Sequence, residues 1–122
     1  MKLRVKGNSL RLRLTRPEVM RLRDAGLVEE SAGFGDGEVL TYRLRSVATP
    51  GPLHAAFHQG TIEVTVSSET VRDWAVAEEV GLYAQAGGLQ IAIEKDFRCL
   101  TRPSGEEPDT YPNPAQDSRA GS

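Results

Sequence analysis

The sequence has little of what most often reveals chemistry or location. It contains one cysteine, so no disulfide can form within the chain. No uncharged apolar run approaches the roughly 20 residues of a membrane-spanning helix. Residues 2–6 alternate in polarity, and neither the apolar core nor the cleavage site of a signal peptide follows Met1. We therefore expect a cytoplasmic protein with no membrane partner.

Familiar catalytic motifs are also missing. There is no GxSxG elbow, HExxH helix or CxxC pair, and the glycine-rich segment 33–37 lacks the GK[ST] ending of a phosphate-binding loop. His54 and His58 are four residues apart on a predicted strand, which separates them by about 13 Å, too far to share a metal. The sequence thus predicts no cofactor and identifies no catalytic residue.

What the chain does contain is regular periodicity. Its 122 residues, 39% hydrophobic and 26% charged, are typical of one folded domain. Alternating polarity predicts a β-hairpin over residues 2–14 and a second over residues 27–45. Between them, a capping box at residues 15–18 and a glycine at position 26 delimit a helix. The pattern of the first half therefore predicts a ββαββ unit.

The same order of elements starts again after the proline-rich segment 49–52. A shift of 52 positions aligns the apolar residues of the first hairpin and helix with later ones, and a shift of 49 aligns the second hairpins. We predict one domain over residues 1–100, with pseudo-repeats 1–48 and 53–100, followed by a flexible polar tail, 101–122. The fold class is α+β: two tandem ββαββ units form a predominantly antiparallel sandwich or partly closed barrel of about eight strands with two helices.

Side-chain parity predicts which strand residues share the core. They are Leu3, Val5, Leu10, Leu12, Leu14, Leu40, Tyr42, Leu44, Ile62, Val64, Val66, Leu89, Ile91 and Ile93. Trp74 lies at helical spacing from Val71, so we expect it to pack into the core and not to stack on a ligand.

Charge is unevenly distributed along the chain. Residues 1–52 carry ten Lys and Arg against six Asp and Glu, whereas residues 53–122 carry five against eleven. If strands 1, 2 and 4 are neighbours, one outer face collects Lys2, Arg4, Lys6, Arg11, Arg13, Arg43 and Arg45. Such a stripe suits an acidic protein or polyanion, but the same cations also solubilise a sheet and protect its edge. Because no aromatic residues are interleaved, we do not expect sequence-specific nucleic-acid binding.

Two further candidates lie near the end of the predicted domain. Glu94 and Asp96 share one face of a strand, as a metal-binding or acid–base pair requires, and carboxylates at positions 106, 107 and 109 would complete the ligands. The alternative is a polar strand end. Cys99 is either a reactive thiol or, in the simpler interpretation, a buried structural one.

The two ends of the chain carry distinctive motifs. KLRVKGNS at 2–9 with RLT at 13–15, and IEKDFRCL at 93–100 with YPNP at 111–114, resemble a family of small uncharacterised bacterial proteins of about this length. The resemblance implies a bacterial, cytoplasmic setting and supplies no catalytic residues. It draws attention to Glu94, Asp96, Cys99 and Asn113 as sites.

A second comparison concerns triphosphate-tunnel enzymes, whose eight-stranded antiparallel barrels open with a Glu-x-Glu-x-Lys strand. The predicted strand count is similar, but the first strand here, residues 2–6, contains no glutamate to hold magnesium. Two hypotheses remain open. The first is a non-enzymatic binding module with a basic sheet face, and the alternative is a metal-assisted phosphotransfer or hydrolase enzyme.

Overall fold

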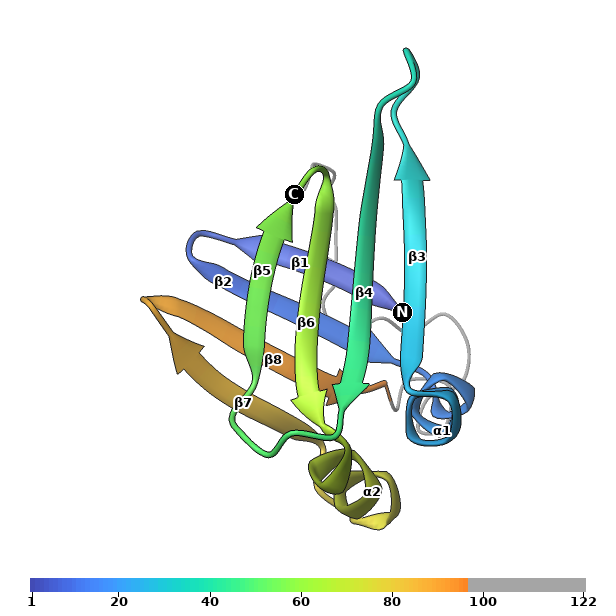
Figure 1. The fold of residues 1–122 in the computed structure, drawn as a ribbon, viewed down its shortest axis with the longest axis vertical. Helices are drawn as coiled ribbons and strands as arrows, with labels where there is room; N and C mark the ends of the chain where they lie inside the picture. Colours follow the sequence, from blue (N-terminus) through green and yellow to red (C-terminus); the bar gives the residue numbers. More distant parts are fainter. Residues whose placement is uncertain (97–122) are drawn as a thin grey trace, which may run out of the picture.

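The computed structural model describes residues 1–96. The predictions for Cys99, for Asn113 and for a tail over residues 101–122 lie outside the described residues. Within them the chain is α+β, with eight strands and two helices (Figure 1). The elements are β1 (Lys2–Lys6), β2 (Ser9–Leu14), α1 (Arg16–Ala25), β3 (Leu27–Gly33), β4 (Val39–Val47), β5 (His54–His58), β6 (Thr61–Ser67), α2 (Ser68–Val76), β7 (Gly81–Ala86) and β8 (Leu89–Lys95).

Both helices begin, and α1 ends, where the local sequence favours it. The backbone N–H of Thr15 donates to the Glu18 carboxylate at 2.9 Å, which confirms this half of the predicted capping box. Gly26 ends α1 with φ at 82°, a left-handed conformation that glycine adopts without strain. At α2, the Ser67 hydroxyl accepts the backbone N–H of Thr70 at 3.1 Å.

The strands form two four-stranded sheets that lie across one another (Figure 1). Sheet A has the order β1-β2-β8-β7 and sheet B the order β3-β4-β6-β5. The outer pairs of each sheet are antiparallel hairpins, whereas the central pairs, β2 with β8 and β4 with β6, are parallel. The expectation of a predominantly antiparallel fold is therefore only partly met, and the sheets do not close into a barrel. Alternation along a strand sets which face is apolar, but it does not choose the neighbouring strand.

The registers of the two sheets correspond under the offsets found in the sequence. Leu12 lies opposite Ile93 in sheet A, and Val64 lies opposite Leu44 in sheet B. Each sheet combines a first hairpin from one half of the chain with a second hairpin from the other half. A duplicated ββαββ unit would produce this arrangement, and the duplication itself stays a prediction.

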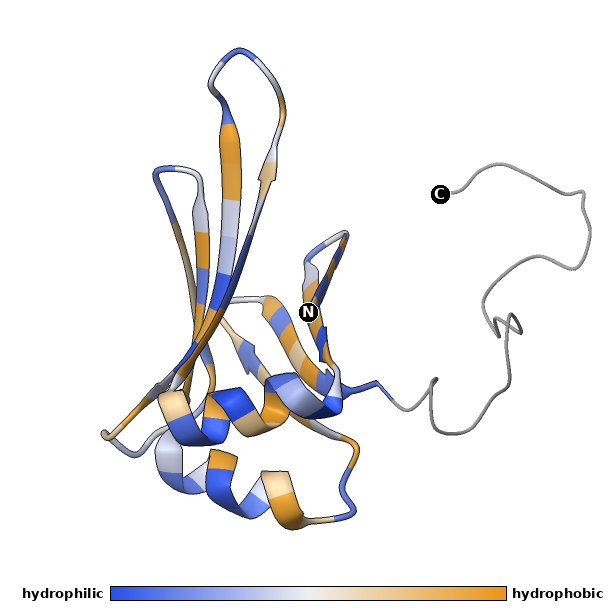
Figure 2. Cartoon of the chain, turned by 90° about the vertical axis from the view of Figure 1, so that its right-hand side faces the viewer, coloured by the Kyte–Doolittle hydropathy of each residue, from blue (hydrophilic) through white to orange (hydrophobic). Residues whose placement is uncertain are grey.

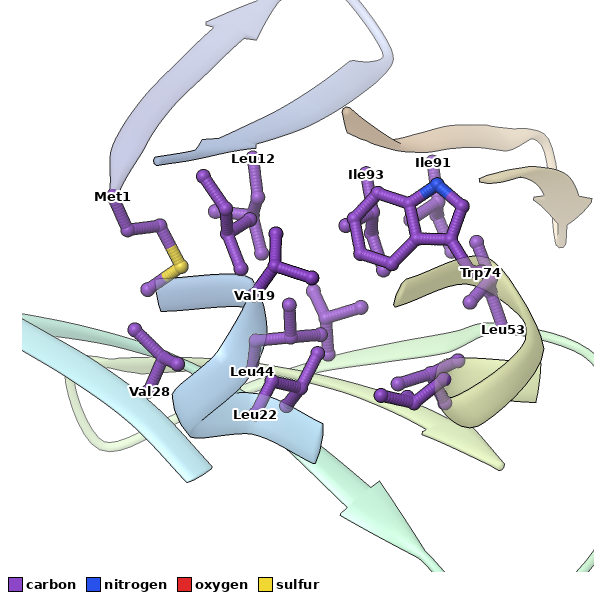
Figure 3. Packing of buried hydrophobic residues seen from close by; sticks show 14 of the residues in the cluster. Met1, Leu12, Val19, Leu22, Val28, Leu44, Leu53, Trp74, Ile91 and Ile93 are labelled. Carbon is purple, nitrogen blue, oxygen red and sulfur yellow. The ribbon is translucent and has the colours of Figure 1, made fainter. Parts of the chain in front are cut away.

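The core fills the space between the sheets at the end closed by the helices (Figure 3). Trp74, from α2, is 1% exposed and packs with Ile91 and Ile93, so the expected core position of the indole is confirmed. Its indole N–H has no hydrogen-bond partner among the described residues. Most of the residues that parity assigned to the core are buried or half-buried.

Burial decreases along the strands away from the helices, where the hairpins splay apart (Figure 2). On β4, Leu44 is fully buried but Leu40 only half-buried. The assignment of Val5 to the core is wrong, since its side chain is 60% exposed. Val5 lies on the edge strand of sheet A, so neighbours cover it from one side only.

Candidate functional site

Five cations lie on the outer face of the β1–β2 hairpin. Lys2 lies opposite Arg13, and Arg4 lies opposite Arg11. Cross-strand partners point to the same face of a sheet, and the alternate residues Leu3 and Leu12 point to the core. We call Lys2, Arg4, Lys6, Arg11 and Arg13 the cationic face. The structure therefore brings together five of the seven cations that the sequence grouped.

Two consecutive cross-strand pairs of like charge oppose stability. A directly opposed like-charge pair costs a few tenths of a kcal/mol up to about 1 kcal/mol relative to a neutral pair. The corresponding hairpin in sheet B, β5–β6, has no such pairs: His54 lies opposite Thr65, and Ala56 lies opposite Glu63. The hairpin architecture therefore does not require cations at these positions.

The expected adjacency of strands 1, 2 and 4 is wrong, because β4 belongs to sheet B. Arg43 and Arg45 are thus separated from the cationic face, and each has a carboxylate of its own. Arg43 binds Glu29 on β3 at 2.7 Å, and Arg45 binds Glu63 on β6 at 2.6 Å. On the outer face of sheet B these two arginines are thus matched by two glutamates.

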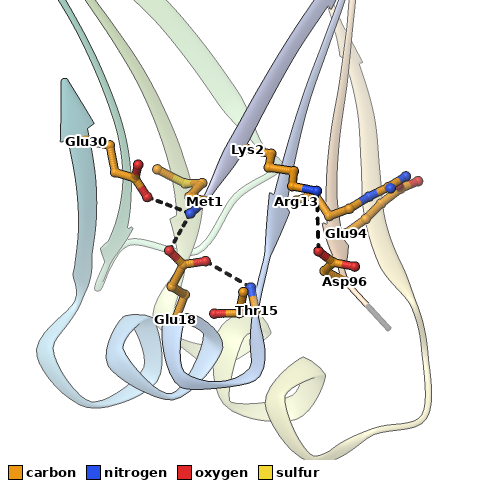
Figure 4. A network of polar contacts seen from close by, with 8 residues as sticks. All are labelled: Met1, Lys2, Arg13, Thr15, Glu18, Glu30, Glu94 and Asp96. Atoms are coloured by element: carbon orange, nitrogen blue, oxygen red, sulfur yellow. Dashed lines mark hydrogen bonds and ion pairs between the residues drawn. The ribbon is translucent and has the colours of Figure 1, made fainter. Parts of the chain in front are cut away.

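Glu94 and Asp96 border the cationic face. Glu94 lies 3.5 Å from Arg11 and 3.4 Å from Arg13. Asp96 lies 4.0 Å from Lys2 (Figure 4). Glu94 also accepts the Tyr83 hydroxyl at 2.9 Å. This hydrogen bond is the main reason that the pKa of Tyr83 is raised above its ordinary value. Within residues 1–96, Glu94 and Asp96 thus form ion pairs with three of the five cations, Lys2, Arg11 and Arg13.

The metal site proposed from the sequence is not tested by this geometry and stays a prediction. The two carboxylates do lie at the same end of sheet A, but their nearest charged partners are cations. Among residues 1–96, no three His, Cys, Asp or Glu side chains lie close enough together to hold a metal ion. The other proposed ligands, at positions 106, 107 and 109, are not among the described residues.

A cleft of about 390 Å³ adjoins the cationic face. It is lined by residues 1–4, Arg11, Arg13 and, from sheet B, Tyr42. Consecutive residues of a strand point to opposite faces, so a hollow on one face would be lined by alternate residues. Lys2, Leu3 and Arg4 line this hollow in succession, so it reaches both faces of β1 at the edge of sheet A and extends over Arg11 and Arg13 of β2. No sequence pattern indicates this cleft, because its walls come from both sheets.

A partly buried ion-pair cluster lies at one end of this edge (Figure 4). The Met1 ammonium is bound by the carboxylates of Glu18 and Glu30, the latter at 2.6 Å. Burial opposes the charge on the ammonium, but the hydrogen bonds to both carboxylates outweigh it and raise its pKa above 8.0. Burial likewise opposes ionisation of Glu18, yet the ammonium and the Thr15 N–H hold its pKa below 4.5. The cluster fixes the start of β1 against α1 and β3.

A second hollow, of about 520 Å³, lies between the helices and the end of β8. Lys95 lines it, donates to the Ala77 carbonyl at 2.7 Å and lies 5.2 Å from the centre of the Trp74 ring. Burial lowers the pKa of Lys95. The other charged residues in its walls, Arg16, Glu78 and Asp96, carry mixed signs, so the hollow has no clear preference for ligand charge.

Comparison with protein families matches residues 1–115 to a family of unknown function, DUF7009. The chain belongs to this family. No curated protein and no solved structure matches it. Membership in DUF7009 agrees with the expected resemblance to an uncharacterised family and assigns no activity. No helix within residues 1–96 is long and apolar enough to cross a membrane.

Proposed function

We propose that the chain is a small non-enzymatic binding module whose cationic face binds an anionic or acidic partner. The observation that supports it is the direct opposition of Lys2 to Arg13 and of Arg4 to Arg11. These pairs reduce stability, the fold does not demand them, and the corresponding hairpin lacks them. A bound anion would neutralise both pairs together.

The simpler explanation is that the cations only solubilise the sheet and protect its edge. Protection of an edge needs isolated charges on the edge strand. It does not need Arg11 and Arg13, which lie on β2, an inner strand of sheet A. The cations extend across two strands, as a surface that binds an anionic group between them would. We place this module in the bacterial cytoplasm, a reducing compartment in which a single cysteine need not form a disulfide.

Retention on an immobilised polyphosphate resin tests the proposal. The unmodified protein should bind at low salt and elute as salt rises, because binding through ion pairs weakens with ionic strength. The double variant Arg4→Gln/Arg11→Gln should bind at least tenfold more weakly. The control is Arg21→Gln/Arg72→Gln, which changes net charge equally at exposed helix positions and should retain binding.

Two results would contradict the proposal. One is a protein that is not retained at any salt concentration. The other is an equal loss of retention in both double variants, since net charge and not the cationic face would then govern the interaction. Thermal unfolding of all variants verifies that each is folded before the comparison is made.

A further inference from the structure

We infer that the free edge of β1 is a strand-addition site for an extended segment of a partner protein in which acidic and aliphatic residues alternate. This rests on the proposed function and specifies the partner of the same site. The first observation is topological. β1 ends sheet A, and no strand within residues 1–96 pairs with its outer edge. No strand of the described part of the chain uses the backbone groups there, and a further strand could pair with them.

The second observation is the cleft of about 390 Å³ beside β1, which residues 1–4 line consecutively. A cleft that follows the edge of a strand is the place that an added strand would occupy. Tyr42, from sheet B, provides the facing wall. The opposite edge of sheet A differs, because β7 lies against β5 of sheet B.

The side chains of β1 specify the chemistry of the added strand. Lys2, Arg4 and Lys6 project from the outer face at two-residue spacing, which is about 6.6 Å in any β-strand. Carboxylates at alternate positions of a second strand have the same spacing, so each meets one cation. An extended acidic segment therefore matches the cationic face in register as well as in charge.

The inner face of β1 determines which residues suit the positions between the acidic residues of the added strand. Leu3 is half-buried and Val5 is 60% exposed, although both point toward the core side of sheet A. An added strand would lay its intervening side chains beside them. Aliphatic residues at those positions would cover Val5 and remove apolar surface from water. The edge thus matches a pattern of acid, aliphatic, acid, aliphatic, acid.

A second copy of β1 does not fit this edge. Pairing two β1 strands would place Lys and Arg of one beside Lys and Arg of the other, which is unfavourable. The cations that attract an acidic strand therefore also disfavour self-pairing.

The test uses a capped peptide of alternating glutamate and valine, Glu-Val-Glu-Val-Glu, matched to the five residues of β1. Binding to the full chain is measured by NMR chemical-shift changes and by calorimetry at low salt. The peptide should bind, and Glu-Glu-Val-Val-Glu, with the same composition, should bind at least tenfold more weakly. Two further peptides carry N-methyl groups on either the valines or the glutamates. Only one of these sets of N–H groups faces β1, so one peptide should bind and the other should not.

The protein variant is Val5→Asp, which sets a carboxylate against the peptide side chains and should weaken binding at least tenfold. Phe57→Asp is its matched control, because Phe57 is the corresponding residue of the β5–β6 hairpin and is 71% exposed. It should bind the peptide as the unmodified protein does.

Strand addition is overturned if the alternating and rearranged peptides bind equally, or if both N-methylated peptides behave alike. It is also overturned if the polyphosphate resin retains the protein but no peptide binds, and in that case the proposed function survives. If the protein binds neither the resin nor the peptide, the proposed function is contradicted, and strand addition, which rests on it, is contradicted as well.

Discussion

Glu18 is the residue at which the cluster around Met1 can be tested without disturbing the helix. In the variant Glu18→Gln the side-chain oxygen can still accept the Thr15 N–H, because Gln serves at this position of a capping box as Glu does. Only the negative charge facing the ammonium is lost. The Glu18 side chain is 12% exposed and the Met1 side chain is fully covered, so water compensates only in part.

The expected loss follows from these contacts. A hydrogen bond to a charged group contributes about 1.5–3 kcal/mol, and Glu30, which is 41% exposed, remains as a second partner. We expect Glu18→Gln to lower the free energy of unfolding by about 2 kcal/mol near neutral pH. With an unfolding entropy of about 2.1 cal/mol/K per residue, this corresponds to a decrease in Tm of roughly 10 °C for a domain of this size.

The loss should depend on pH in both directions. The pKa of the ammonium is raised above 8.0, so its contribution is complete below pH 8 and disappears as pH rises through the raised pKa. The pKa of Glu18 is lowered below 4.5, so its contribution is complete above pH 4.5 and disappears as pH falls through the lowered pKa. The difference between unmodified protein and variant should therefore be largest between these limits.

Urea unfolding followed by circular dichroism across this pH range measures the difference. The matched control is Glu69→Gln, which removes an exposed carboxylate from the first turn of the other helix. It should cost less than about 1 kcal/mol through the helix dipole alone. Equal losses in the two variants, or a loss at Glu18 that stays constant from acid to alkaline pH, would refute the ion-pair explanation.

Two further predictions concern the fold. Leu44→Ala should lower the free energy of unfolding by about 3–4 kcal/mol, because Leu44 is fully enclosed. Leu40→Ala, on the same face of β4, should lower it by only about 1 kcal/mol, because Leu40 is half-buried. Similar losses for the two variants in urea unfolding would contradict the divergence of the sheets. Gly26→Ala should cost about 1 kcal/mol, since alanine is strained at φ 82°, whereas Gly33→Ala, where the backbone is extended, should be neutral or stabilising. Equal effects in calorimetry would show that Gly26 is not held in this conformation.

The individual elements were largely predictable from the sequence because their causes are local. Alternation and the repeated pattern identified all four hairpins, and the capping residues marked both ends of α1 and the start of α2. The core assignment succeeded where a residue lies near the helices and failed at Val5. Parity states which way a side chain points, but the depth of burial depends on how closely the second sheet approaches.

The candidate site was predictable only in part, for the same reason. Alternation along residues 2–6 and 9–14 placed five cations on one face, and the hairpin turn brought them together. Arg43 and Arg45 were grouped with them by parity alone, and the structure puts them on the other sheet beside Glu29 and Glu63. The cleft and the Met1 cluster each join residues from separate helices and strands that lie far apart in the sequence, and no local sequence pattern predicts such contacts.

The sequence by itself determined the strands, the helices, their apolar faces and the cationic face of the first hairpin, because backbone periodicity and capping act over a few residues. Only the tertiary structure decided which hairpins share a sheet, that the central pairs are parallel, and that β1 is left with a free edge beside a cleft. Those outcomes depend on how two apolar surfaces distant in sequence pack together, and many pairings bury the same residues about equally well.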